Sequence, residues 1–463
     1  MLINIKKEKM KKLIRKTAIV LLWLILWQLF ACWVNNSVLF ASPLDTVKAL
    51  GMLVVEVDFF KTLLVSLGKV TIGFLLGLLT GAVLGTFGAK KDWVDDLLRP
   101  VLSFMKSVPV AAFVVLLLIW WGSRWLSVAI VFVVVFPYIY FAFCEGLKQV
   151  DCYMLEVAKV YQMPRKNQWY YLYRRALKPF MDNALKLSFG LAWKSGVAAE
   201  VIGTPNCSIG EGLYMAKTHL NTPEVFAWIV VILLLSTLYE KAGMLVWMRF
   251  CHWKPKCKGP VFREKVDKGF TEGTWVISKS FGDKEVWKKQ EIQLSAGQIY
   301  TLQAPSGRGK TTMLRILAGL EANEEASAKS NQQTEKSTIL CSMVFQEDRL
   351  LLEETPLVNI EMVLGSCRRQ EIWENLLEVI PELETQQTCQ MLSGGMRRRV
   401  CLVRAMLSHA ELILLDEPFT GVDEQTKQQM AEYILSMQQG RTIVVVTHQE
   451  KDAKMLNSTH FKL

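Results

Sequence analysis

The stretch Ala304-Pro-Ser-Gly-Arg-Gly-Lys-Thr-Thr312 decides the fold of the second half of this chain. Residues 298–303, before it, alternate between apolar and polar as a strand does, and residues 313–320, after it, have the apolar spacing of a helix. A glycine-rich turn between a strand and a helix directs backbone N–H groups and the positive end of the helix dipole at a bound phosphate. The stretch therefore predicts a loop that binds the phosphates of a nucleotide.

Within this loop, Lys310 is predicted to contact the outer phosphates and the Thr311 hydroxyl to ligate Mg²⁺. The residues predicted to bind the nucleotide here are Ser306, Gly307, Arg308, Gly309, Lys310, Thr311 and Thr312. Ala304 stands where the pattern G-x-x-x-x-G-K-[ST] has its first glycine. Because one position departs from the pattern, the prediction depends on further motifs elsewhere in the chain.

The composition restricts the class of protein. The 463 residues carry a formal charge of +11 at pH 7 and a mean hydropathy of +0.23, an unusual pair for a soluble enzyme. A membrane protein with cationic cytoplasmic loops has this combination, and so does a nucleic-acid-binding protein with a large core. The apolar runs fall almost wholly before residue 250, so we favour the membrane protein and expect no nucleic-acid partner. The ten cysteines include no C-x-x-C pair and hence no zinc or redox motif of that type.

The first half has the pattern of six membrane spans. Residues 1–16 are basic, and residues 17–34 form an uncharged run long enough to cross a bilayer. A secretory signal peptide is the alternative, but its apolar core would be shorter, and here further spans follow. The further apolar runs are 62–88, 101–121, 125–146, 180–203 and 224–248. Basic residues favour the cytoplasmic side, so 89–93, 148–178 and both termini are predicted to be cytoplasmic.

Small and charged residues within the spans suggest how they pack. Four glycines, spaced four residues apart, share one face of the second predicted span and would permit close packing against another helix. They are Gly73, Gly77, Gly81 and Gly85. Lys194 and Glu200 lie in the fifth span, where charge is costly and often marks a transport pathway. Pairing between helices is the alternative for these two residues.

The predicted cytoplasmic segment 152–178 differs from the other loops. Its residues 154–161 are helical and amphipathic, and basic residues follow them. A short helix that is too polar to enter the membrane is suited to docking on a soluble partner. An ordinary helix at the membrane interface is the alternative.

The first half resembles the permeases of bacterial ATP-binding cassette (ABC) importers, especially those of the nitrate, sulfonate and taurine type. The resemblance is carried by Arg99-Pro-Val-Leu-Ser-Phe-Met-Lys-Ser-Val-Pro109, Glu156-Val-Ala158 and Ala192-Trp-Lys-Ser-Gly-Val-Ala-Ala-Glu-Val-Ile-Gly203. It implies that Glu156–Ala158 belongs to a coupling helix that sits in a cleft of the ATPase. Val157 replaces the family's first alanine, and Tyr161-Gln162 lies where a glycine is expected.

Residues 251–268 are basic, contain two prolines and lack apolar periodicity, which predicts a linker near anionic headgroups.

A soluble α/β pattern runs from residue 269 to 463. In it, the pair Asp416-Glu417 ends a buried strand. Phosphoryl transfer requires mainly positioning and charge neutralisation. We therefore expect Asp416 to hold Mg²⁺ and Glu417 to polarise the attacking water as general base.

Three further groups complete the predicted site. Gln346 follows a strand and is expected to sense both the metal and the water, while His448 follows another strand and is expected to contact the γ-phosphate. The run Ser393-Gly394-Gly395 opens a helix and offers a second set of N–H groups, which require a phosphate from another subunit. Phe281 is a candidate for stacking on adenine, with a place in the core as the alternative.

These segments, in this order, closely resemble the nucleotide-binding subunit of ABC transporters over nearly all of residues 269–463. The resemblance adds Asp423, in the run Gly421-Val-Asp423, to the nucleotide-binding residues. It implies two ATPase domains arranged head to tail with two ATP molecules between them. Each ATP would touch the phosphate loop of one domain and Ser393–Gly395 of the other.

The sequence thus predicts a multidomain chain, in which an all-α polytopic membrane domain (1–250) precedes an α/β P-loop ATPase domain (269–463). We interpret it as half of an ATP-driven importer in a bacterial inner membrane, with a second half-transporter and a separate extracytoplasmic solute-binding protein as partners. The resemblance implies a sulfonate, taurine, nitrate or a small vitamin precursor as substrate. An exporter and a weakly hydrolysing ATP-binding sensor are the alternatives.

Overall fold

The computed structural model describes residues 2–252, 272–281, 284–303, 307–323, 340–365 and 368–462. The predicted linker at 251–268 therefore lies almost entirely outside the described residues. The chain forms two compact units. The membrane unit comprises Met1–Gln149 and Ala176–Trp253, and the ATPase unit comprises Val150–Arg175 and Lys254–Leu463. The predicted docking segment thus folds with the ATPase rather than with the spans that flank it.

Helices make up the membrane unit. They are α1 (Leu2–Val34), α2 (Pro43–Val55), α3 (Phe59–Lys90), α4 (Asp92–Ser107), α5 (Val110–Trp121), α6 (Leu126–Lys148), α9 (Arg174–Gly203, from Ala176 on), α10 (Ile209–Thr218) and α11 (Thr222–His252). In the described part of the chain, four helices are long and apolar enough to cross a membrane: α1 from Thr17, α3, α6 and α11. These correspond to four of the six predicted spans.

The other two predicted spans have a different form. The run predicted at 101–121 is a pair of helices, α4 and α5, bent by 104° at a short break. Pro109 lies in the break, and its ring disfavours helical geometry at Val108, which is extended. The run predicted at 180–203 lies within α9, which is helical throughout but interrupted by charged residues. Six spans therefore stays a prediction, with four or five supported by length and composition.

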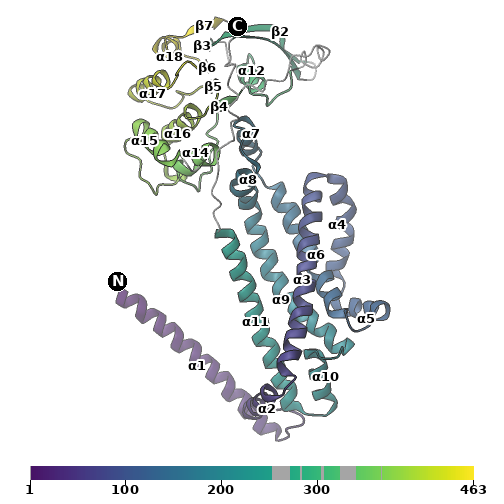
Figure 1. Ribbon diagram of the computed structural model, residues 1–463. Helices are drawn as coiled ribbons and strands as arrows, with labels where there is room; N and C mark the ends of the chain where they lie inside the picture. Colours follow the sequence, from purple (N-terminus) through teal and green to yellow (C-terminus); the bar gives the residue numbers. More distant parts are fainter. Residues whose placement is uncertain are drawn as a thin grey trace. The chain divides into compact units, whose positions relative to one another are not determined.

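The glycine face of α3 packs directly on α6, which is the close helix packing predicted from the glycine spacing. Figure 1 shows α3 running beside α6. A Cβ atom added at Gly73 would lie 2.6 Å from the carbonyl oxygen of Val128, and one at Gly85 would lie 2.7 Å from that of Tyr140. Such distances leave no room for a side chain. The absence of side chains at these positions lets the two backbones approach and form the centre of the membrane unit.

Glu200 is paired between helices, which was one of the two alternatives for it. Its side chain is completely buried in α9 and accepts a hydrogen bond of 2.8 Å from the hydroxyl of Ser66 in α3. The same hydroxyl accepts a hydrogen bond from the backbone N–H of Ile209, at the start of α10. Ser66 therefore connects three helices, while Lys194 is exposed on the surface of the unit.

The ATPase unit is built on a parallel sheet with the strand order β4-β5-β6-β3-β7, which Figure 1 shows beside its helices. The strands are β3 (Ile299–Gln303), β4 (Cys341–Val344), β5 (Leu412–Asp416), β6 (Thr442–Val446) and β7 (Thr459–Lys462). Every residue of β5 and β6 is buried, as expected for parallel strands covered on both faces. An antiparallel pair, β1 (Glu272–Phe281) and β2 (Lys284–Ser295), forms a second sheet.

The helices of this unit include α12 (Lys310–Leu317), α14 (Pro356–Leu364), α15 (Arg369–Val379), α16 (Gly394–Met406), α17 (Glu424–Ser436) and α18 (Glu450–Met455), with a 3-10 turn, η3 (Cys389–Met391). The docking segment contributes α7 (Cys152–Val160), α8 (Arg165–Gln168) and a π-helical turn, η1 (Trp169–Tyr173). Its apolar residues, among them Met154, Val157 and Tyr161, are buried in the same core as the sheet. The amphipathic face predicted from the sequence is the face that packs on the ATPase.

The ends of α7 follow from its sequence. Asp151 caps the first turn, where its carboxylate accepts a hydrogen bond of 2.8 Å from the Tyr153 N–H. At the other end, the Met163 N–H donates to the Ala158 carbonyl and the Gln162 N–H to the Lys159 carbonyl, the two bonds of a Schellman motif. Gln162 has φ of +48°, which is left-handed. The family resemblance implies a glycine at this position, and the backbone of Gln162 has the left-handed geometry that glycine favours.

We expect Gln162→Gly to leave the unfolding temperature of the protein unchanged or to raise it. A residue with a Cβ atom costs about 1 kcal/mol in the left-handed region, and glycine removes that cost. The gain offsets or exceeds the backbone entropy that glycine loses on folding, which costs about 0.5–1 kcal/mol. Lys159→Gly, three residues earlier in the ordinary helical region, is the matched control and is expected to destabilise by about 1 kcal/mol. Thermal unfolding of both variants in detergent gives the comparison. An equal loss in both would contradict a strained Gln162.

Candidate active site

Four predicted catalytic segments meet at one edge of the parallel sheet. Strands β4, β5, β6 and β3 are neighbours in that order, and each ends at the same edge because all pairs are parallel. Gln346 follows β4, Asp416 and Glu417 end β5, His448 follows β6, and the phosphate loop follows β3. Ligands of open α/β sheets bind at the carboxyl ends of the strands, so the topology assembles one site from segments far apart in the sequence.

The described part of the phosphate loop has the expected backbone. Gly307 and Gly309 have φ of +82° and +79°, and Gly309 precedes the first turn of α12. Trp287, in β2, donates its indole N–H to the Gly309 carbonyl at 3.1 Å. Sequence reasoning did not single out Trp287, because nothing local connects it to the loop 22 residues later. Arg308 is exposed and Thr311 and Thr312 are half-buried; Ala304, Pro305 and Ser306 lie outside the described residues.

Lys310, His448 and Glu417 form a connected row of polar groups. Lys310 Nζ lies 3.5 Å from His448 Nδ1, and His448 Nε2 lies 2.8 Å from Glu417 Oε1. If Lys310 donates to Nδ1, the imidazole proton is on Nε2 and faces the carboxylate. Burial lowers the pKa of Lys310, opposed by the nearby charges of Glu417 and Asp416. A bound polyphosphate would compensate for the same burial.

The Asp416 carboxylate has the surroundings of a metal ligand. It is 1% exposed, and among the described residues its oxygens form no hydrogen bond of good geometry, although the Thr311 hydroxyl lies close enough to lower its pKa. Burial raises its pKa, while Thr311, Arg398 and Lys310 oppose that rise and the Glu417 charge adds to it. A buried carboxylate without partners is costly unless a cation compensates for it. A hard cation such as Mg²⁺, with an adjacent threonine hydroxyl, suits these oxygens.

Glu417 is held in an uncommon backbone conformation, with φ of +48°. Its N–H donates to the Val446 carbonyl at the end of β6, and its Oε2 accepts from the Thr420 hydroxyl at 3.2 Å. Its side chain is 17% exposed, so water reaches the carboxylate. Left-handed geometry in a non-glycine residue is costly and concentrates at functional sites. Here it accompanies a carboxylate at the edge of the sheet.

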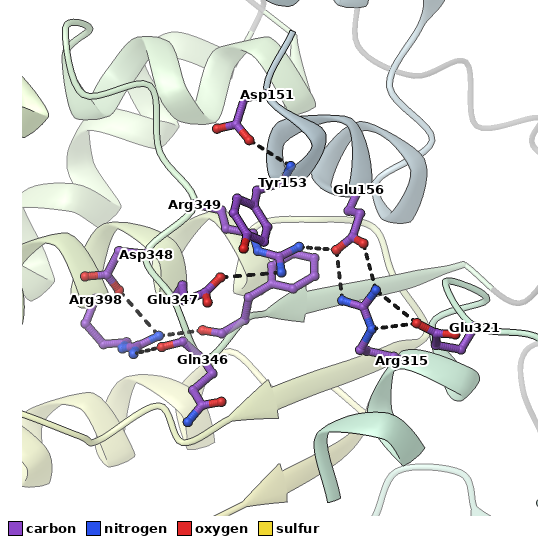
Figure 2. Close-up of polar contacts among 11 residues, drawn as sticks. Asp151, Tyr153, Glu156, Arg315, Glu321, Gln346, Glu347, Asp348, Arg349 and Arg398 are labelled. Carbon is purple, nitrogen blue, oxygen red and sulfur yellow. Dashed lines mark hydrogen bonds and ion pairs between the residues drawn. The ribbon is translucent and has the colours of Figure 1, made fainter. Parts of the chain in front are cut away.

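Gln346 is positioned by an arginine from another motif. Arg398, in α16, donates to the backbone carbonyls of Phe345 and Gln346, and its guanidinium lies 3.4 Å from Asp348 (Figure 2). The Gln346 side chain is exposed. Arg398 lies five residues after Ser393, so the segment predicted to bind a second nucleotide is joined to the segment that carries Gln346.

The remaining predicted residues lie away from this row. Ser393 caps α16 by accepting from the Met396 N–H, and Gly394 next to it is exposed. Gly395 lies in the same first turn. Asp423 caps α17, and hydrogen bonds from the Thr426 N–H and hydroxyl lower its pKa. Phe281 ends β1, but its side chain lies outside the described residues.

Glu156 binds two arginines that the sequence analysis did not identify (Figure 2). Its carboxylate accepts two hydrogen bonds from Arg315, at 2.7 and 2.9 Å, and one from Arg349. Arg315 lies in α12, five residues after Lys310, and Arg349 lies three residues after Gln346. One carboxylate therefore joins the docking helix to the helix that follows the phosphate loop and to the loop that carries Gln346. The two arginines, led by Arg315, lower the pKa of Glu156 to about 2.

Two further contacts fasten the docking segment. The Tyr161 hydroxyl donates to the Met343 carbonyl in β4 at 3.0 Å, and its ring lies under the guanidinium of Arg404. Asn167 donates to the Met362 carbonyl of α14 at 3.0 Å. Burial raises the pKa of Tyr161 to about 12, so the phenol stays protonated and remains a donor. Nothing in the local sequence distinguishes these residues from an ordinary amphipathic pattern.

Comparison with known proteins agrees with this geometry. A family model described as "ABC transporter" matches residues 287–420, and one described as "Binding-protein-dependent transport system inner membrane component" matches residues 73–240. An aliphatic sulfonates import ATP-binding protein of Rhodococcus jostii is 36% identical over 185 residues, which cover 39% of this chain and 74% of that protein. The chain belongs to the ABC transporter family.

A second relative, from Shouchella clausii and also named as an aliphatic sulfonates import ATP-binding protein, is 33% identical over 39% of this chain and 72% of its own length. Among solved structures, a dimeric bacterial ABC transporter cassette is 26% identical and covers 42% of this chain, with a TM-score of 0.36. This ABC transporter combines the inner-membrane component and the ATPase in one chain. It binds ATP and couples its hydrolysis to transport across the bacterial inner membrane.

Proposed function

We propose that this chain is half of an importer that carries a small organic anion of the sulfonate type into the cell. Two copies form the working unit, a separate extracytoplasmic protein delivers the substrate, and both termini are cytoplasmic. The observation that carries the proposal is the contact of Glu156 with Arg315 and Arg349, because it connects a segment of the permease half to the helix after the phosphate loop and to the loop that carries Gln346.

ATP hydrolysis follows from the row of groups at the sheet edge. Lys310 binds the outer phosphates, Glu417 accepts a proton from the attacking water, and His448 orients Glu417 while it contacts the γ-phosphate. Thr311, Asp416 and Gln346 would hold Mg²⁺, which neutralises phosphate charge when bound. The buried oxygens of Asp416, which form no hydrogen bond of good geometry among the described residues, support this assignment.

The second copy supplies what one chain lacks. Gly394 is exposed at the start of α16, with backbone N–H groups suited to a phosphate. The nucleotide site of the same chain is formed by other segments. In a head-to-tail pair, Ser393, Gly394 and Gly395 of one copy would close over the ATP of the other, with Asp423 nearby.

The substrate class comes from the relatives and from the permease half together. The two relatives are named for aliphatic sulfonates, which are small organic anions. The inner-membrane component matched at residues 73–240 is described as binding-protein-dependent, which supports delivery by a separate protein. Import, rather than export, is the direction in which such a delivery operates.

Uptake by native cells tests the proposal with the binding protein in place. Deletion of the chain is expected to abolish ATP-dependent uptake of labelled ethanesulfonate or taurine, and re-expression is expected to restore it. Uptake of an unrelated amino acid is the control for general loss of energy. The proposed substrate class would be overturned if deleted and restored cells took up sulfonates at the same rate and also took up nitrate at the same rate.

A further inference from the structure

An open cavity in the membrane unit contains charges that the ATP site does not use. It has a volume of about 510 Å³ and lies between α4 and α6. Its wall is formed by Arg99, Ser103, Lys106, Ser107, Phe141 and Glu145. Small-molecule pockets in proteins range over roughly 300–1,000 Å³, so the cavity has the size of a ligand site.

Lys106 lies beside the middle of α6. Its ammonium is 4.9 Å from the ring centroids of both Tyr138 and Phe141. Tyr138 stands roughly 18 Å from the Leu126 end of α6 and roughly 15 Å from the Lys148 end, at the rise of an α-helix. Because α6 has the length and composition of a membrane span, a bilayer around it would place the exposed ammonium of Lys106 at depth. Charge at this depth is costly and is kept where it faces a partner or a water-filled path.

The other charged side chains around the cavity form ion pairs, and Lys106 forms none among the described residues. Asp95 forms ion pairs with Arg99 at 3.1 Å and with Lys148 at 2.8 Å, and Arg99 also lies 3.8 Å from Glu145. In the part of the chain that the structure describes, no carboxylate forms an ion pair with Lys106. Among the residues that line the cavity, two cations, Arg99 and Lys106, stand against one carboxylate, Glu145, which leaves a surplus of one positive charge.

The helix that carries Lys106 breaks just beyond it. α4 ends at Ser107, and α5 leaves at an angle of 104°. Discontinuous membrane helices commonly form substrate and ion sites near the bilayer midplane, because the break exposes backbone and polar groups to a cavity. The break and the unmatched ammonium are separate observations, and both indicate the same place.

We propose that this cavity is the membrane subsite for the transported molecule, and that the molecule is a small organic monoanion with a short apolar tail. Its negative group pairs with Lys106 beside the Ser103 hydroxyl, and its tail packs on the ring of Phe141. A single negative charge balances the surplus, whereas a dianion or a cation leaves charge uncompensated. The inference rests on the proposed import function, and an alkanesulfonate has this composition.

Binding of ethanesulfonate to the full-length protein, measured by calorimetry in nanodiscs of zwitterionic lipid, tests the proposal. Lys106→Met, which removes the charge at similar length, is expected to weaken binding about tenfold or more, since a charged hydrogen-bonding partner is lost. Lys106→Arg keeps the charge and is expected to bind within a few-fold of the parent protein. Lys186→Met, which removes an exposed lysine of α9 outside the cavity, is the matched control and is expected to change nothing.

Each variant is also assayed for basal ATP hydrolysis, which none of these lysines is expected to affect. This readout separates a folding defect from loss of the subsite. Binding that is equal in Lys106→Met and the parent protein would overturn the proposal, and so would a parent protein that hydrolyses ATP but binds no ethanesulfonate. Tighter binding of methylphosphonate as a dianion would overturn the predicted charge. Failure of the import function would appear separately, in the uptake assay on deleted cells.

Discussion

Glu417→Gln is expected to lower the rate of ATP hydrolysis by about 10²- to 10⁴-fold, the range for loss of a general base. Glutamine keeps the size of the side chain and the left-handed backbone, which are set by the Val446 contact. It cannot accept the proton of the attacking water. Lys310 and the glycines of the phosphate loop are unchanged, so ATP should still bind. The measurements are phosphate release and ATP affinity of the purified protein in lipid.

Glu424→Gln is the matched control for this experiment. It makes the same chemical change in the first turn of α17, but Glu424 is 69% exposed and pairs only with Lys427 at 3.7 Å in the described residues. Its rate should equal that of the parent protein. If Glu417→Gln and the parent protein release phosphate equally fast, Glu417 is not the general base and the catalytic assignment is wrong.

Glu156→Ala is expected to separate transport from ATP hydrolysis. The substitution leaves Arg349, which is 7% exposed, without its main carboxylate partner, and it removes both hydrogen bonds to Arg315. Breaking a partly buried pair in this way costs about 1–3 kcal/mol. The groups that contact ATP are retained, so basal hydrolysis should persist. Uptake in cells should fall strongly, because the docking helix would lose its ion pairs to α12 and to the loop that carries Gln346.

The control for this variant is Glu347→Ala. Glu347 also approaches Arg349, at 3.7 Å, but it is 64% exposed and contacts solvent. Its removal should leave uptake and unfolding temperature nearly unchanged. If Glu156→Ala transports as well as Glu347→Ala does, the ion pairs with Arg315 and Arg349 are not the route of coupling.

Acid should reproduce the effect of the Glu156 substitution. The pKa of Glu156 is about 2 in the folded protein and about 4.5 as an ordinary glutamate. A lowered folded-state pKa stabilises the protein above the ordinary value, and the contribution is lost as the pH falls from about 4.5 towards 2. The unfolding temperature of the parent protein should therefore drop over that range more than that of Glu156→Ala. Parallel pH curves for the two proteins would contradict this assignment.

The sequence by itself determined the order and type of the ATPase segments. Each motif is a strand followed by a short loop, so local patterns are sufficient to locate Lys310, Gln346, Asp416, Glu417 and His448. Parallel strands bring their carboxyl ends to one edge, which makes the assembly of the site a consequence of the fold class. Similarly, the four-residue glycine spacing in residues 73–85 predicted a face for close helix packing, because that spacing repeats nearly every turn.

Tertiary structure alone decided which distant residues meet. Glu156 and Arg315 are 159 positions apart, and Glu156 and Arg349 are 193 apart, so no periodicity within a helix or strand connects them. The surplus charge at Lys106 is equally invisible in the sequence, since it depends on which carboxylates in α4 and α6 are already paired. Local patterns determine which chemical groups the chain contains and on which element each lies. Only packing determines which of those groups remain available to a ligand or to a second loop.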